Sequence, residues 1–97
     1  MRARLIRTEA PPEVIEAGIQ MTKDALVPAA REREGFRGYI GLVDAEQGLG
    51  LAITLWEDEQ TEQASDEASR ASREQLAESF GAKVSVEKYD VAITELA

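Results

Sequence analysis

The segment Leu49–Trp56 alternates large aliphatic side chains with a second, mostly small set. Successive side chains of a β-strand point to opposite faces, so this alternation predicts a strand with two different faces. Burial of each large aliphatic side chain contributes roughly 1.5–3 kcal/mol, and we therefore expect the aliphatic face to form the core. That face holds Leu49, Leu51, Ile53 and Leu55, and the other holds Gly50, Ala52, Thr54 and Trp56.

Three further strands and two helices are predicted from the rest of the chain. Apolar residues recur at alternate positions in the strands and near helical spacing in the helices. We expect strands at 2–9, 36–43 and 84–93, a first helix at 12–33, and a second helix that begins at 58 or 61 and ends at about 80. This order is that of the split βαβ, or ferredoxin-like, arrangement. The sequence thus predicts one α+β domain over residues 1–97, with a four-stranded antiparallel sheet that carries both helices on one face.

Three local irregularities are expected within these elements. Pro28 lacks an N–H, so the first helix should kink or break around residues 24–27. The apolar residues of the last strand change phase, which predicts a bulge near Glu87 and Lys88. The inner face of the second helix is small, so it either leaves a roomy cleft for a planar molecule or packs close to the sheet. Its expected members are Ala64, Ala68, Ala71, Leu76 and Phe80.

The composition excludes several kinds of chemistry. The chain has no Cys and no His, so it offers no thiol nucleophile, no zinc–thiolate site and no imidazole base or metal ligand. Its formal net charge of -8 disfavours binding to nucleic acid or to anionic membranes. Residues 1–9 do not have the pattern of a signal peptide, and no apolar run approaches the roughly 18 residues of a membrane span. We therefore expect a soluble cytoplasmic protein without a bound metal.

Neither face of the predicted sheet has the charged pattern of a solvated surface. The strand at 36–43 adds Tyr39 and Val43 on one side, and Phe36, Ile40 and Leu42 on the other. Because the helices cover one face only, a monomer would expose a larger apolar patch than soluble monomers usually tolerate. We expect a homodimer whose two sheets form a shared barrel. The alternative is a monomer with a semi-polar outer face.

Several segments, in the same order along the chain, resemble the antibiotic biosynthesis monooxygenase family of dimeric α/β barrels. They are Gly35-Phe36-Arg37-Gly38-Tyr39, Leu42-Val43-Asp44 and Ile53-Thr54-Leu55-Trp56-Glu57, preceded by residues 26–31 and followed by residues 86–91. These are mostly turn and packing residues, so the resemblance implies the fold more strongly than an activity. Members of known function include oxygenases of polyketide quinols that use no metal or flavin, haem-degrading enzymes, and small signalling or stress-linked proteins.

The two enzymatic branches make different demands on the residues. The haem-degrading enzymes hold iron through a His on the second helix, with a Trp earlier on that helix, and this chain has neither there. The quinol oxygenases typically rely on an Asn, a Trp and an Arg near the substrate. The chain contains no Asn, so it departs from that pattern. The resemblance therefore implies no haem and no other cofactor.

Six residues are the candidates for a pocket: Trp56, Tyr39, Arg37, Arg4, Thr54 and Tyr89. Trp56 either stacks on a flat ligand or plugs the barrel end or the seam between helix and sheet, with its N–H bonded to backbone. Arg37 and Arg4 either stabilise an enolate or phenolate, or are exposed or paired with the abundant carboxylates. The two Tyr residues either donate hydrogen bonds to a phenolic substrate or pack in the sheet.

Two functions remain open from the sequence. The first is a cofactor-independent monooxygenase that acts on a planar aromatic or quinol-like small molecule, activated through the substrate's own deprotonated ring. The second is a non-catalytic dimeric small-ligand-binding or stress-associated module of the same fold. An enclosed pocket that holds Trp56 and at least one Arg would favour the first.

Overall fold

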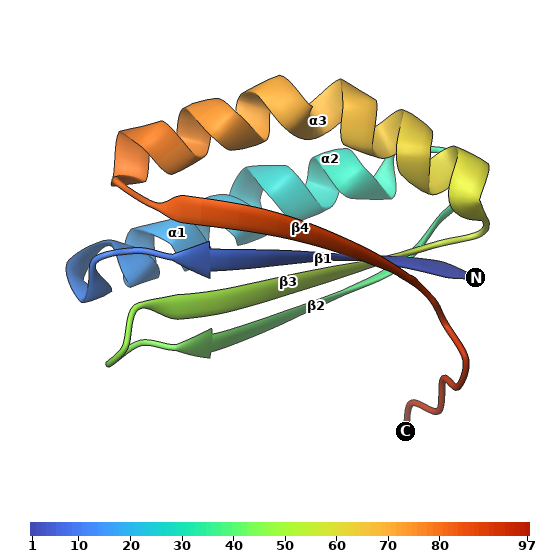
Figure 1. Ribbon diagram of the computed structural model, residues 1–97, viewed down its shortest axis with the longest axis horizontal. Helices are drawn as coiled ribbons and strands as arrows, with labels where there is room; N and C mark the ends of the chain where they lie inside the picture. Colours follow the sequence, from blue (N-terminus) through green and yellow to red (C-terminus); the bar gives the residue numbers. More distant parts are fainter.

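The computed structural model describes residues 1–97, which form an antiparallel four-stranded sheet with the helices on one side (Figure 1). The strand order across the sheet is β2-β3-β1-β4, so β2 and β4 are the edges. The strands are β1 (Arg2–Glu9), β2 (Phe36–Asp44), β3 (Leu49–Trp56) and β4 (Lys83–Asp90). The ferredoxin-like arrangement predicted from the sequence is confirmed.

The first helical region consists of short consecutive segments with different hydrogen-bond patterns. They are η1 (Pro12–Val14), α1 (Ile15–Met21), the π-helical η2 (Thr22–Leu26) and α2 (Val27–Arg31). The N–H of Val27 donates to the carbonyl of Thr22, five residues earlier. Pro28 has no N–H for an α-helical bond to Asp24, so the regular pattern cannot continue through this turn. The irregularity expected around residues 24–27 is thus a π-helical turn.

The long helix α3 (Glu59–Phe80) has well-defined ends. The Asp58 carboxylate accepts a hydrogen bond from the Thr61 N–H at 2.8 Å, and the Thr61 hydroxyl oxygen accepts one from the Asp58 N–H at 3.4 Å. This reciprocal capping box satisfies N–H groups that the first helical turn leaves free. Gly81, with φ of 65°, ends the helix in the left-handed conformation that glycine adopts without strain. The chain then turns directly into β4, so α3 and β4 run side by side (Figure 1).

The helices cover the face of the sheet opposite to the one expected to form the core. Arg4 pairs with Thr54 in the β1–β3 register, and the Arg4 side chain bonds Glu62 of α3. The face beneath the helices therefore holds Gly50, Ala52, Thr54 and Trp56, and Leu49, Leu51, Ile53 and Leu55 lie on the open face. The prediction was wrong because strand alternation separates two faces without showing which one the helices cover.

The prediction of the inner face of α3 is wrong for the N-terminal half of the helix. Leu76 and Phe80 are half-buried as expected, but the three alanines Ala64, Ala68 and Ala71 are exposed. The buried residues of α3 are Glu62, Ser65 and Asp66. The N-terminal half of the helix thus presents a polar face to the sheet.

The prediction of a bulge near Glu87 and Lys88 is also wrong. β4 pairs with β1 in unbroken register from Lys83 to Asp90. Lys88 follows Val86 on the face of β4 beneath the helices. The apolar pattern is therefore interrupted by a charged residue on the same face, and the register does not change. The register shift of the sheet lies instead in β2, between Phe36 and Gly38.

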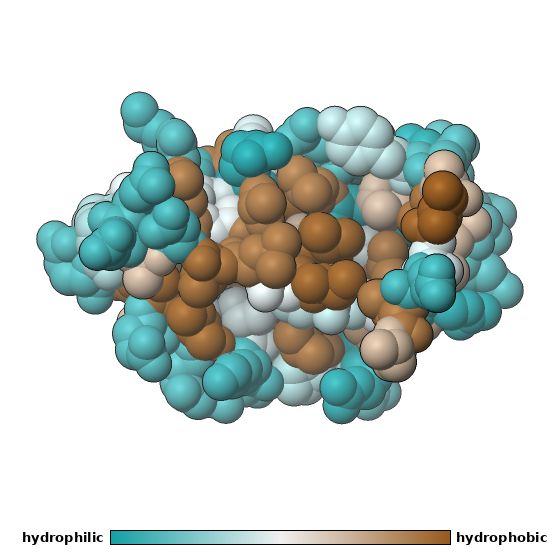
Figure 2. All heavy atoms as spheres, turned by 90° about the horizontal axis from the view of Figure 1, so that it is seen from below, coloured by the Kyte–Doolittle hydropathy of each residue, from teal (hydrophilic) through white to brown (hydrophobic).

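The open face of the sheet is largely apolar. Figure 2 shows this side of the molecule, where hydrophobic side chains form a broad patch rimmed by hydrophilic ones. Few side chains are fully buried, since only 8 of 97 residues are, and the hydrophobic ones among them are Trp56, beneath the helices, and Leu55, on the open face. None of the helices combines the length and the hydropathy that a membrane crossing requires.

Candidate functional site

Arg4 and Trp56 form a buried centre between the sheet and the start of α3. The guanidinium carbon of Arg4 lies 5.4 Å from the centroid of the Trp56 ring, a cation–π distance. Phe36 packs edge-on against the indole, with ring centroids 5.7 Å apart and an interplanar angle of 79°. Trp56 is 1% exposed and Arg4 is 4% exposed. A fixed cation therefore lies against an aromatic plane in a layer from which water is largely excluded.

Thr54 holds the indole in one orientation. The Trp56 Nε1–H donates to the Thr54 hydroxyl oxygen at 2.9 Å, and that hydroxyl donates in turn to the Arg4 carbonyl at 3.5 Å. Of the two interpretations of Trp56 from the sequence, the geometry is nearer to the packing one. That interpretation differs from the structure in one respect: it expected the indole N–H to bond the backbone, and the acceptor is the side-chain hydroxyl of Thr54.

The Arg4 guanidinium is bonded on one side only. Its Nη1 donates to the Glu62 carboxylate at 3.1 Å, to the Glu62 carbonyl at 3.1 Å and to the Ser65 hydroxyl at 2.8 Å. Its Nε is buried and has no partner. Burial lowers the pKa of Arg4, and the hydrogen bond to Glu62 opposes that effect. Because arginine keeps its charge in proteins, this is a permanent cation with donor capacity to spare.

Lys88 connects this centre to a second carboxylate on α3. Its Nζ lies 3.3 Å from Glu62 and 3.0 Å from Asp66. Asp66 also pairs with Arg73 at 2.6 Å and with Arg70 at 3.2 Å. Burial acts to raise the pKa of Asp66, but the hydrogen bonds from Arg73, Lys88 and Arg70 outweigh it and hold that pKa well below its usual range.

This partly buried ion network carries more positive than negative charge. Four cations (Arg4, Arg70, Arg73 and Lys88) surround two carboxylates (Glu62 and Asp66). The protein as a whole has a formal net charge of -8. The network is therefore a local positive region on an acidic protein, and it is suited to an anionic ligand.

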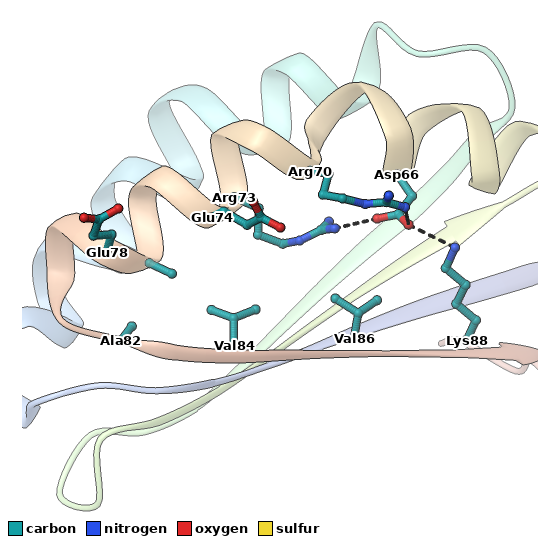
Figure 3. Close-up of a pocket in the computed structure, with 10 residues that line it drawn as sticks. Asp66, Arg70, Arg73, Glu74, Glu78, Ala82, Val84, Val86 and Lys88 are labelled. Atoms are coloured by element: carbon teal, nitrogen blue, oxygen red, sulfur yellow. Dashed lines mark hydrogen bonds and ion pairs between the residues drawn. The ribbon is translucent and has the colours of Figure 1, made fainter.

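An open groove with a volume of about 560 Å³ lies beside the network, between α3 and the edge strand β4 (Figure 3). This volume is typical of small-molecule sites. Val84 and Val86 point from β4 toward the helix, and charged side chains of α3 lie across from them (Figure 3). The groove is lined by Asp66, Arg70, Arg73, Glu74, Ala77, Glu78, Ala82, Val84, Val86 and Lys88.

The structure places the six sequence candidates in different surroundings. Arg4, Thr54 and Trp56 meet in the buried centre. Tyr39 pairs with Thr54 in the β2–β3 register, and burial raises its pKa while a hydrogen bond with Thr22 opposes the rise. None of the six lines the groove.

The other two candidates, Arg37 and Tyr89, lie away from the buried centre. Arg37 forms an exposed ion pair with Glu57 at 3.2 Å. Tyr89 is on the open face, where its hydroxyl donates to Glu87 at 2.6 Å and where that bond raises the pKa of the tyrosine.

Sequence reasoning missed the charged residues that α3 and β4 contribute. Glu62, Asp66 and Arg73 recur at helical spacing, which places them on one face of the helix. That spacing was a usable signal, but an acidic stripe on a helix is usually solvated. Here it is buried because Arg4 and Lys88 reach it from two strands.

Two uncharacterized proteins of Mycobacterium tuberculosis are similar to the chain in sequence. Rv2557 is 33% identical over 90 residues and Rv2558 is 33% identical over 91 residues, which is 93% and 94% of this chain. The chain spans only about 40% of the length of these curated relatives. No protein-family model matches the chain.

Solved structures are similar over nearly the whole chain. A Deinococcus radiodurans protein, described as a candidate antibiotic biosynthesis monooxygenase, gives a TM-score of 0.78 at 16% identity, with 100% of both chains covered. The monooxygenase ActVA-Orf6 of Streptomyces coelicolor, in complex with nanaomycin D, gives 0.66 at 15% identity, with 98% of this chain and 92% of that one covered.

A dimeric ferredoxin-like protein from an uncultured marine organism is also similar, with a TM-score of 0.75 at 10% identity and 100% of both chains covered. At these identities the likeness concerns the path of the backbone. The resemblance found in the sequence is thus confirmed for the fold, and the chain has the ferredoxin-like fold of the antibiotic biosynthesis monooxygenase structures.

Proposed function

We propose that this protein is a cofactor-independent monooxygenase of the antibiotic biosynthesis monooxygenase family, acting on a planar phenolic or quinol-like molecule. The observation that carries this proposal is the buried Arg4–Trp56 pair, in which a cation with an unpartnered N–H lies against an aromatic plane. The likeness to named monooxygenase structures supports it.

The chemistry begins with loss of a proton from the substrate. The resulting phenolate or enolate is electron-rich enough to react with O₂, which forms a C–O bond and a hydroperoxide at a ring carbon. Loss of water from the hydroperoxide leaves a carbonyl, so a ring CH₂ and O₂ become C=O and H₂O. The positive excess of the ion network stabilises the anion, and such electrostatic stabilisation is usually the largest contribution of a protein to a reaction of this kind.

The proposed active form is a homodimer. The open face of β3 carries four large aliphatic residues, and exposed apolar side chains continue this surface on the two edge strands, with Leu42 of β2 49% and Tyr89 of β4 53% exposed. A second copy of the chain would cover this patch. The dimeric ferredoxin-like structure supports this assembly.

A second candidate function is binding of the same class of molecule without turnover. It is favoured by the intrachain bonds of the buried centre, because the Trp56 N–H is occupied by Thr54 and the Arg4 Nη1 by α3. The groove, moreover, is open and is lined by two arginines but not by Trp56, so it is not the enclosed pocket with Trp56 and an Arg that would favour the monooxygenase. These features suit a binding module as well as an enzyme.

Oxygen uptake separates the two functions. The purified protein is assayed over a panel of quinols and anthrones in the presence of a metal chelator, and the products are analysed for a new carbonyl. We expect Arg4→Lys, which keeps the charge but not the planar donor array, to lower kcat/KM by roughly 10²-fold. Arg37→Lys is the matched control on an exposed arginine and should retain full activity. Saturable binding of a panel member without oxygen uptake would support the second function and reject the first.

A further inference from the structure

The end of the groove near the middle of α3 holds more positive charge than its partners neutralise. Arg70, Arg73 and Lys88, which we call the cationic end, all bond Asp66. Lys88 also contacts Glu62, but the negative charge of Glu62 is already neutralised by Arg4, so the positive charge of Lys88 is not neutralised there. The side chains of Arg70 and Lys88 are 56% and 30% exposed, so both can reach a ligand in the groove.

The end of the groove near the C-terminus of α3 has the opposite charge. Glu74 and Glu78, which we call the acidic end, are one helical turn apart, line the groove and are exposed. Neither takes part in any ion pair of the structure. Two unpaired carboxylates one turn apart repel each other, and a cation between them removes that repulsion.

Along α3 the charge of the groove changes sign between the adjacent residues Arg73 and Glu74 (Figure 3). The outermost charges, Arg70 and Glu78, are eight residues apart, which corresponds to about 12 Å of helix and suits a small molecule. Between the ends, Val84 and Val86 of β4 face the helix (Figure 3). An apolar body of that length would cover these two side chains and bring a charged group to each end.

We infer that the groove binds an elongated zwitterion, with an anionic group at the cationic end, an apolar body over β4 and a cationic amine at the acidic end. The acidic end selects against a simple dianion, which would place its second charge beside Glu74 and Glu78. This inference goes beyond the proposed function, because it concerns ligand selection and does not require turnover.

The polarity of the groove is tested with three rigid probes of one shape. They are biphenyl carboxylates that carry at the far end an aminomethyl group, a methyl group or a second carboxylate. Affinities are measured by calorimetry at low and at physiological salt. We expect the aminomethyl probe to bind about fivefold more tightly than the methyl probe, and the dicarboxylate to bind most weakly. Equal affinities for the three probes, or no binding at millimolar concentration, would overturn the inference.

Two charge reversals on α3 give a sharper comparison. Glu78→Lys changes the acidic end, whereas Glu67→Lys makes the same change of net charge at an exposed position that does not line the groove. We expect Glu78→Lys to reverse the order of the aminomethyl and dicarboxylate probes, and Glu67→Lys to leave it unchanged. The same effect from both variants would show that only net charge matters and would reject the site. Since affinity is the readout, failure here leaves the oxygen-uptake test of the proposed function intact.

Discussion

The guanidinium of Arg4 lies over the indole of Trp56 at 5.4 Å, while its Nη1 bonds the Glu62 carboxylate at 3.1 Å. One side chain thereby joins β1, β3 and α3. These contacts join the long helix to the sheet, and a charged hydrogen bond with both partners buried is costly to break.

Replacement of Arg4 by Met should lower the free energy of unfolding by about 3 kcal/mol, because the buried carboxylate of Glu62 loses one of its two cations. Urea unfolding followed by tryptophan fluorescence measures this change. The matched control is Arg37→Met, which removes an exposed ion pair with Glu57 and should cost less than 1 kcal/mol. If the double variant Arg4→Met, Glu62→Met is no more stable than the sum of the single changes predicts, the two residues are not coupled.

The stability of the fold should fall at acidic pH through Asp66. Its pKa in the folded protein lies well below the ordinary value of 3.8, so its contribution is complete above about pH 4 and is lost as the pH falls further. Asp66→Asn should lower stability at pH 7 and flatten the dependence of stability on pH below 4. Denaturant midpoints between pH 2.5 and 7 measure both effects, and an unchanged acid slope in the variant would contradict the assignment.

The open face of the sheet should control oligomeric state. Leu51→Lys places a charge in the middle of the apolar patch and should convert a dimer, of twice 10.6 kDa, into a monomer at micromolar concentration. Light scattering after size-exclusion chromatography measures the mass. Leu26→Lys is the control, because Leu26 is an exposed apolar residue of the helical region, 41% exposed and outside the sheet. A monomeric parent protein would reject the dimer itself.

The sequence predicted the order and type of the elements because strand alternation and helical spacing are local signals. It did not predict which face of β3 the helices cover, since that depends on packing between distant segments. Trp56 and Thr54 were found together because residues two apart in a strand share a face. Glu62 and Asp66 were missed because buried acids require partners, and theirs come from Arg4 and Lys88 on other strands.

The direct turn from α3 into β4 at Gly81 fixes the two walls of the groove to each other by covalent bonds at one end only. At the other end, ion pairs of Lys88 with Asp66 and Glu62 hold the walls together. Dissolved ions weaken partly exposed pairs, with a screening length of about 8 Å at physiological ionic strength. Added salt should therefore loosen the groove at its cationic end, where ion pairs join α3 to β4, more than at its acidic end, where the backbone turn at Gly81 joins them.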